Sequence, residues 1–188
     1  MLPKELLEFL ARIETLKTNG RHSVTAGGVT ETVAAHSWRL AVMALLLADE
    51  FPRMDMDKVV RMCLIHDFGE AVTGDIPAFD KTVANERTEE RAVAGLLATL
   101  PQRQREKLAL LFDEMDAQQT DEARLYKALD KLEAVIQHNE SDIATWIPLE
   151  YELNLTYGEE QAAQFPFLKA LREQLRRDTE EKIHAKRA

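Results

Sequence analysis

The sequence predicts an all-α protein that folds as a single helical bundle, and three observations support this. Only seven of the 188 residues are glycine. No stretch alternates strictly between apolar and polar residues over four to eight positions, so strands have almost no support. Apolar residues recur instead at spacings of three and four, the period of an amphipathic helix. We therefore expect one domain over residues 1–188, with a core at about 20–140 and a helical extension over 141–188.

Residues that start or stop helices bound the predicted elements. The first helix ends near Asn19 and Gly20, which tolerate a left-handed cap. Pro52 stops the second because it lacks the amide hydrogen that a helix interior needs, and Asp55 or Asp57 can cap the third. The apolar face of the first helix consists of Leu6, Leu7, Leu10, Ile13 and Leu16. The later helices are expected at about 33–51, from 55 or 57 toward 70, and at 85–99, 102–115, 121–140 and 167–184.

The segment 21–32, which contains Gly27 and Gly28, is predicted to be a loop. A structureless connection of this length is uncommon in a small domain and indicates a functional role. The region after Glu140 is irregular because Pro148 and Pro166 interrupt it. The final helix has alternating charges, which are typical of a solvated face.

The composition excludes several classes of partner. With 24 Lys plus Arg against 33 Asp plus Glu, the net charge is -9, which would repel a nucleic-acid polymer or an anionic membrane. No apolar run approaches the length that spans a bilayer, and the first residues are acidic where a signal peptide would be basic. The single Cys63 lies in an apolar run and is expected to be a buried thiol. We expect a cytoplasmic protein.

Two imidazoles and two carboxylates on three successive long helices could bind a divalent cation. They are His36, His66, Asp67 and Asp130. Such ligands suit Mn, Co, Fe or Zn, and without cysteine ligands the ion stays open to water, as catalysis requires. The alternative is ordinary, because a histidine on an apolar helix face is more often a hydrogen-bonded core residue. The acid-rich end of the third helix, from His66 to Glu70 and on to Asp75, favours the metal site because bunched charges need a cation.

Helical periodicity places only some of these side chains. His36 shares an apolar stripe with Leu40, and His66 shares one with Cys63, so both imidazoles should face the core. Glu70 follows His66 by one helical turn on the same face, whereas Asp67 points to the side. Asp130 lies off the apolar stripe of its own helix, where periodicity alone predicts exposure to solvent.

Four ordered motifs resemble the HD-domain superfamily of metal-dependent phosphohydrolases, and in particular its 5'-deoxynucleotidase group. The superfamily pattern is a histidine on one helix, an adjacent His-Asp pair on the next and an aspartate on a later helix. The matching stretches are residues 31–39 (ETVAAHSWR), 66–70 (HDFGE), 73–77 (TGDIP) and 128–133 (ALDKLE). The resemblance covers about residues 20–140 and is only loose beyond them.

The resemblance implies a role for each site residue. It implies that His36, His66, Asp67 and Asp130 bind one divalent ion, which could be Mn, Co, Fe, Mg or Zn. Glu70 would position or deprotonate the attacking water, and Asp75 would assist the leaving group. If a second ion binds, as in some relatives, its ligands would be Glu70, Asp75 and the carbonyl of Ile76. The basic residue that holds the substrate phosphate is expected to be Arg21.

Some residues depart from the family pattern or are expected to have no catalytic role. Ala35 stands where relatives often carry an acidic residue, and His22 where they often carry tryptophan, which puts nucleotide contacts from this loop in doubt. We expect Trp38 and Trp146 to be packing residues. His138 is predicted to lie on the surface, and His184 in a charged tail.

The expected function is that of an enzyme that removes phosphate from a nucleoside 5'-monophosphate, most favourably a deoxynucleotide. One alternative is another HD phosphohydrolase, acting on a cyclic or polyphosphorylated nucleotide. The other is a non-catalytic helical binding protein whose site residues form only a charge network.

A homodimer is also expected. Family members are commonly dimeric, and the irregular segment 143–167 carries apolar residues without an obvious internal partner. These residues are Trp146, Ile147, Leu149, Tyr151 and Leu153.

Overall fold

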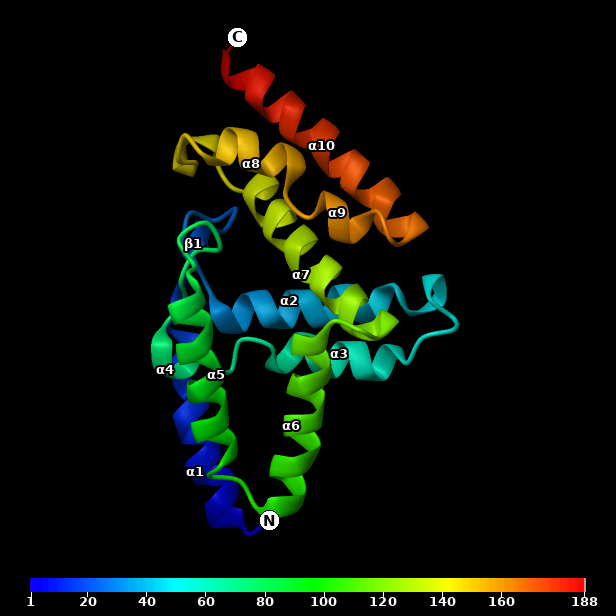
Figure 1. Ribbon diagram of the computed structural model, residues 1–188. Helices are drawn as coiled ribbons and strands as arrows, with labels where there is room; N and C mark the ends of the chain where they lie inside the picture. Colours follow the sequence, from blue (N-terminus) through cyan, green and yellow to red (C-terminus); the bar gives the residue numbers. More distant parts are fainter. Residues whose placement is uncertain (188) are drawn as a thin grey trace.

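The computed structural model describes residues 1–187 and confirms the all-α class, with one small hairpin added (Figure 1). Its helices are α1 (Pro3–Ile13), α2 (Val33–Leu46), α3 (Met56–Ile65), α4 (Glu70–Thr73), α5 (Val83–Leu97), α6 (Gln102–Ala117), α7 (Asp121–Glu140), α8 (Glu150–Thr156), α9 (Glu159–Ala162) and α10 (Pro166–Arg187). Short 3-10 helices cover η1 (Glu14–Lys17), η2 (Ala48–Glu50) and η3 (Ile143–Thr145). Over residues 1–187, none of the helices combines the length and the apolar character needed to cross a membrane.

Helices α2, α3 and α7 form the centre of the molecule. They run past one another in Figure 1 and pack together through fully buried side chains such as Leu40, Met62 and Leu129. Side-chain caps start all three helices, because Thr32, Asp55 and Thr120 each accept a hydrogen bond from a backbone amide of the first turn. His36 and Asp130 therefore lie on two of the three helices that share the core, and His66 and Asp67 follow directly after the third.

The segment 21–32 is not a loop, which corrects the prediction. Residues Gly20–Val24 form β1 and Thr30–Thr32 form β2, an antiparallel pair in which Gly20 lies opposite Thr32. Gly28, with φ of 79°, supports the turn between them. The strands were missed because they have only five and three residues and carry no apolar alternation.

The third helix also ends earlier than predicted. Helix α3 stops at Ile65, and the chain turns through residues 66–69 before the single turn of α4 begins at Glu70. Glu70 therefore does not follow His66 on one continuous helix. Its backbone amide instead donates to the carbonyl of Asp67, which keeps the two acidic residues within one tight turn.

The C-terminal extension packs against α7, at the end of the molecule away from the N-terminus (Figure 1). Helices α8 and α10 contact each other, and Arg172 Nη2 of α10 donates to the carbonyl of Asn154 at 2.8 Å. The apolar segment after Glu140 thus has an internal partner, contrary to the prediction, and Trp146 is buried. Helix α10 is not solvated all round, since Leu168 and Leu175 are buried.

One other prediction about packing is wrong. Trp38 is 64% exposed on α2 and is not a packing residue. The leucines of α1 are also largely exposed, and Phe9 is the residue of that helix that enters the core. His184 is exposed and Cys63 is fully buried, as predicted.

Candidate active site

His36 lies in the first turns of α2 and is fully buried. Its Nδ1 forms a short hydrogen bond with the Glu133 carboxylate of α7, and its Nε2 lies 3.1 Å from Asp130 Oδ1. The bond at Nδ1 fixes the ring so that Nε2 points toward the acidic residues. This is the orientation that a metal-binding imidazole requires.

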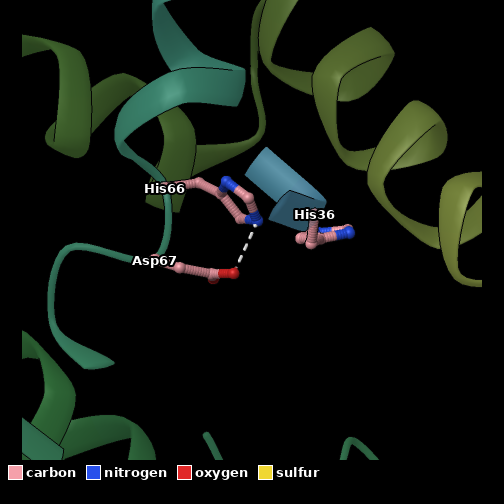
Figure 2. Close-up of side chains that lie close together, drawn as sticks. All are labelled: His36, His66 and Asp67. Atoms are coloured by element: carbon pink, nitrogen blue, oxygen red, sulfur yellow. Dashed lines mark ion pairs between the residues drawn. The ribbon is translucent and has the colours of Figure 1, made fainter. Parts of the chain in front are cut away.

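His66 and Asp67 come directly after α3, where the chain leaves the helix. Figure 2 shows the His66 ring facing the Asp67 carboxylate, with His36 beside them. His66 Nδ1 donates to the carbonyl of Cys63 at 2.9 Å, so Nε2 of the neutral ring carries a lone pair. Nε2 lies 3.0 Å from Asp67 Oδ2 and 3.6 Å from Asp130 Oδ1, yet within residues 1–187 it makes no hydrogen bond.

This arrangement requires a positive charge. A buried nitrogen lone pair that faces two carboxylates is unfavourable unless a cation lies between them. Burial alone lowers the pKa of His66, but Asp67 and Asp130 outweigh it and raise the pKa to about 10, so without a metal a proton takes the place of the cation. Ligand atoms of His36, His66 and Asp67 all lie within 4.8 Å of one another. The donor set therefore fits a divalent metal ion.

Asp130 lies within this group, although its helical position predicted exposure. Its carboxylate contacts both imidazoles and accepts from Lys127 Nζ at 3.0 Å, one turn earlier on α7. Burial would raise the pKa of Asp130, but Lys127 and the two histidines hold it well below its usual range. Asp130 therefore stays ionised, as a metal ligand must.

Glu70 and Asp75 lie beside the two histidines, where acidic groups crowd one another. Glu70 is buried, and burial together with Asp67 and Asp75 raises its pKa to about 9. Burial also raises the pKa of Asp75, although Arg21 opposes the shift. Ile76 follows Asp75 and is partly buried in the turn after α4. The proton-binding groups and the metal-binding groups thus form one continuous cluster.

Arg21 extends from β1 into this acidic cluster. Its Nη1 lies 3.5 Å from Asp67 Oδ2 and 3.8 Å from Asp75 Oδ1. Burial lowers the pKa of Arg21, but the surrounding carboxylates outweigh it and raise the pKa above its ordinary value. A permanent guanidinium charge next to the histidine and aspartate groups is suited to bind a phosphate.

Comparison with known proteins assigns the family. The family model described as HD domain matches residues 13–172. The chain belongs to the HD domain family. It is 35% identical over 141 residues to the human protein named 5'-deoxynucleotidase HDDC2, covering 73% of this chain and 68% of the human one. The protein of the same name from Dictyostelium discoideum is 29% identical over 143 residues, covering 71% of this chain and 74% of that one. The resemblance seen in the sequence motifs is therefore confirmed.

A solved structure has the same fold. It is described as a predicted metal-dependent phosphohydrolase from Magnetospirillum magnetotacticum, with a TM-score of 0.81 and 30% identity, covering 95% of this chain and 93% of that one. The likeness includes the C-terminal extension, which the sequence motifs do not cover.

Two carboxylates that support this HD domain site were not recognised in the sequence. Glu133 accepts from both His36 and Arg39, and Arg39 also pairs with Glu140 at 2.5 Å. Glu31 accepts from Ser23 Oγ at 2.6 Å and lies 3.3 Å from Arg21 Nε. Glu133 could have been found, because it follows Asp130 by three residues and so shares its helix face. Glu31 opens the quoted stretch 31–39, but its contact with Arg21 could not be predicted because the hairpin that brings them together was not predicted.

A second histidine and carboxylate cluster lies outside the HD motifs. Glu150 of α8 is 2% exposed, and its Oε1 lies 3.2 Å from Nε2 of both His22 and His138. His138 also contacts the Asn154 amide at 3.0 Å through Nδ1, so it is not the surface residue that was predicted. Helical periodicity could not reveal this cluster, because His22 lies on β1 and Glu150 lies in the irregular C-terminal extension.

Proposed function

We propose that this protein is a metal-dependent phosphohydrolase that removes phosphate from deoxyribonucleoside 5'-monophosphates. The observation that carries the proposal is the unpaired His66 Nε2, which faces Asp67 and Asp130 next to Arg21. The donor set calls for a cation, and the guanidinium supplies a contact for the substrate phosphate. The names of the similar curated proteins support the choice of a deoxynucleotide.

The metal-binding residues in this proposal are His36, His66, Asp67 and Asp130. When bound, a divalent ion of this kind lowers the pKa of a coordinated water and polarises a phosphoryl oxygen. Mn, Co, Fe, Mg and Zn all remain candidates. If a second ion takes part, its ligands are Glu70, Asp75 and the carbonyl of Ile76.

Each of the other residues has a distinct task. Arg21 binds the phosphate oxygens and neutralises the charge that develops on them during in-line attack. Glu70 accepts the proton of the attacking water in its ionised form; without a metal, burial and the neighbouring carboxylates raise its pKa to about 9, and a bound cation would favour the ionised form. Asp75, whose pKa is also raised, donates a proton to the 5'-oxygen that leaves.

Two other functions share much of this site. A phosphohydrolase of cyclic or polyphosphorylated nucleotides would use the same metal ligands and differ in the surrounding cavity. A helical binding protein would need no attacking water, and the pair Glu70 and Asp75 would then have no role. The buried, protonatable Glu70 beside the histidines favours an enzyme.

The test combines metal analysis of the purified protein with a panel of substrates. We expect phosphate release from deoxyribonucleoside 5'-monophosphates in the presence of Mn, Co, Fe, Mg or Zn. Ribonucleoside monophosphates, cyclic nucleotides and deoxynucleoside triphosphates serve as comparisons. Preferential hydrolysis of a cyclic or polyphosphorylated nucleotide would replace the proposal, and no hydrolysis with any metal would refute it.

The homodimer and the cytoplasmic location stay predictions. Light scattering at micromolar concentration should give about twice the chain mass of 21.4 kDa. A mass near 21.4 kDa would refute the homodimer.

A further inference from the structure

A large cavity adjoins the candidate site between α5 and α6. Its volume is about 690 Å³, and its lining includes His66, Asp67 and Glu70 together with residues of both helices. His66 Nε2 and Glu70 Oε2 are buried and have no hydrogen-bond partner in the part of the chain that the structure describes. The cavity therefore reaches the polar atoms that need a cation.

Carboxylates far outnumber cationic side chains in the lining of this cavity. Seven carboxylates line it, against two lysines. Lys81 pairs with Glu89 at 2.6 Å and Lys127 pairs with Asp130 at 3.0 Å, so each lysine already has an acidic partner. The other carboxylates are left in excess, and the cavity has a net negative charge. The seven are Asp67, Glu70, Glu86, Glu89, Glu90, Asp113 and Asp116.

Three of these carboxylates lie close together across the two helices. Burial, Glu90 of α5 and Asp113 of α6 raise the pKa of Asp116, which follows Asp113 by three residues on the same helix face. All three side chains are exposed, so a hydrated ion can reach them from solvent. Like charges that the fold holds together attract counter-ions, and a divalent cation neutralises them best.

The wall between the carboxylates is apolar. Leu97, Phe112 and Met115 are buried and line the cavity. A cleft that combines one sign of charge with low-dielectric walls focuses its electric field and raises the local concentration of counter-ions. Hydrated cations would therefore collect in this cavity, next to the ligand atoms of His66 and Asp67.

The other side of the candidate site has the opposite charge. A smaller cavity there is bordered by Arg21, whose guanidinium stays charged at any ordinary pH. A divalent cation that approached on that side would be repelled. The acidic cavity is therefore the favourable route for a cation.

We infer that the acidic cavity between α5 and α6 is the entrance through which the divalent cation reaches its ligands. Glu90, Asp113 and Asp116 attract the hydrated ion and raise its concentration at the site, and none of the three is a final ligand. The inference rests on the metal site of the proposed function, but it does not depend on the substrate. It assigns a role to α5 and α6, which carry none of the expected metal ligands.

The test measures how fast metal-free protein takes up Co²⁺, whose visible absorption changes when protein ligands replace its water. Stopped-flow mixing gives the association rate constant. We expect the triple variant Glu90→Gln, Asp113→Asn and Asp116→Asn to associate with Co²⁺ about 10-fold or more slowly than the wild-type protein, because such clefts raise association rates by about 10- to 10³-fold. At saturating Co²⁺ the variant should still bind as much metal as the wild-type protein, since its ligands are intact.

Two further variants separate the charge of the cavity from other effects. The variant Glu90→Asp, Asp113→Glu and Asp116→Glu keeps every charge and should keep nearly the wild-type rate constant. A matched control, Glu152→Gln, Glu173→Gln and Glu181→Gln, removes the same number of charges from exposed positions of α8 and α10, at the far end of the molecule (Figure 1). It should also keep nearly the wild-type rate constant.

Salt gives a second measurement of the same effect. Raising the ionic strength screens the field of the cavity, so the wild-type rate constant should fall toward that of the neutral triple variant, which should depend on salt much less.

The inference and the proposed function fail in different ways. If the neutral triple variant takes up Co²⁺ as fast as the wild-type protein, or if the α8 and α10 control is slowed equally, the cavity is not the entrance, while the metal site stands. Loss of bound Co²⁺ in the neutral triple variant at saturation would also overturn the inference, because the three residues would then be ligands. If the wild-type protein binds no divalent metal, both the proposed function and the inference are refuted.

Discussion

Two clusters in this protein have the same composition, two histidines around one carboxylate, but different hydrogen bonding. In the first, His36 and His66 direct Nε2 toward Asp130. In the second, His22 and His138 direct Nε2 toward Glu150. Glu150 is the one carboxylate that both of these imidazoles face, and its other oxygen accepts the backbone amide of Ile147 at 2.8 Å.

The first cluster is incomplete because His66 uses Nδ1 to bind a backbone carbonyl and presents a lone pair to two carboxylates. The comparison teaches that residue types alone do not identify a metal site. The distinguishing feature is a buried imidazole nitrogen that faces two carboxylates and has no hydrogen-bond partner among residues 1–187. The following experiments can break or sharpen this difference.

Loss of a histidine should have opposite consequences for metal binding in the two clusters. We expect His66→Ala to lose the metal and to reduce phosphate release to background, because a direct ligand is removed. His138→Ala should retain wild-type metal content. Elemental analysis and a phosphate assay measure these effects, and circular dichroism checks the helices. Full metal content in His66→Ala would rule out this site assignment.

Loss of Glu70 should separate metal binding from chemistry. A positioned general base typically contributes about 10²- to 10⁴-fold, so Glu70→Ala should lose that much in kcat while it keeps the metal. Glu70→Gln should be nearly as slow, because it cannot accept the proton. Turnover within a few-fold of wild type would mean that another group activates the water, and loss of the metal would make Glu70 a ligand.

Glu133 should affect metal affinity although it lies behind the ligands. Removing a carboxylate that orients a ligating histidine typically costs about 10- to 100-fold in metal affinity or activity, and we expect this of Glu133→Gln. Glu140→Gln is the control, because Glu140 pairs with the same Arg39 but is 51% exposed and does not touch His36. Competition with a chelator measures both variants, and equal affinities would contradict the role of Glu133.

Metal affinity should rise with pH. In the metal-free protein the pKa of His66 is raised to about 10, so below that pH a proton must leave before the metal binds. Each displaced proton lowers the apparent affinity about tenfold per pH unit of acidification, which chelator competition between about pH 6.5 and 8.5 can measure. A flat profile would show that His66 is unprotonated.

The raised pKa of His66 also determines how the stability of the metal-free protein changes with pH. A raised histidine pKa stabilises the fold fully below the ordinary value of 6.5, and this contribution is lost as the pH rises toward about 10. The melting temperature of the metal-free protein should therefore fall over that range. A bound metal should oppose the fall.

Glu150→Gln should have the smallest effect on the metal site. It leaves buried hydrogen bonds imperfectly made, so we expect a loss of about 1–3 kcal/mol in the free energy of unfolding and unchanged metal content. Thermal denaturation and elemental analysis test the two parts. Loss of metal in Glu150→Gln would show that the second cluster also binds an ion.

The sequence predicted the long helices well and the short elements poorly. The predicted helix at 121–140 matches α7, because its apolar stripe is regular and Thr120 caps it. The hairpin was missed because its register depends on contacts between strands rather than on an apolar pattern. The extension after Glu140 was judged unpartnered because α10, which covers it, follows later in the chain.

The candidate site shows the same limit. Periodicity placed His36 and His66 toward the core correctly, since His36 lies on the apolar stripe of α2 and His66 directly follows that of α3. It could not place Asp130, because Lys127, His36 and His66 surround that carboxylate only after three helices pack. His138 was misjudged for a similar reason, as Glu150 and Asn154 reach it from α8.

The spacing of the site along the chain has a consequence for biosynthesis. His36 and Asp130 are 94 residues apart, so a ribosome-bound nascent chain cannot assemble the metal-binding group until α7 has emerged. Since α7 is also the helix on which α8 and α10 pack, the ion would bind only to chains whose central helices have already folded. Metal uptake during synthesis would therefore mark the moment at which translation has delivered a finished core.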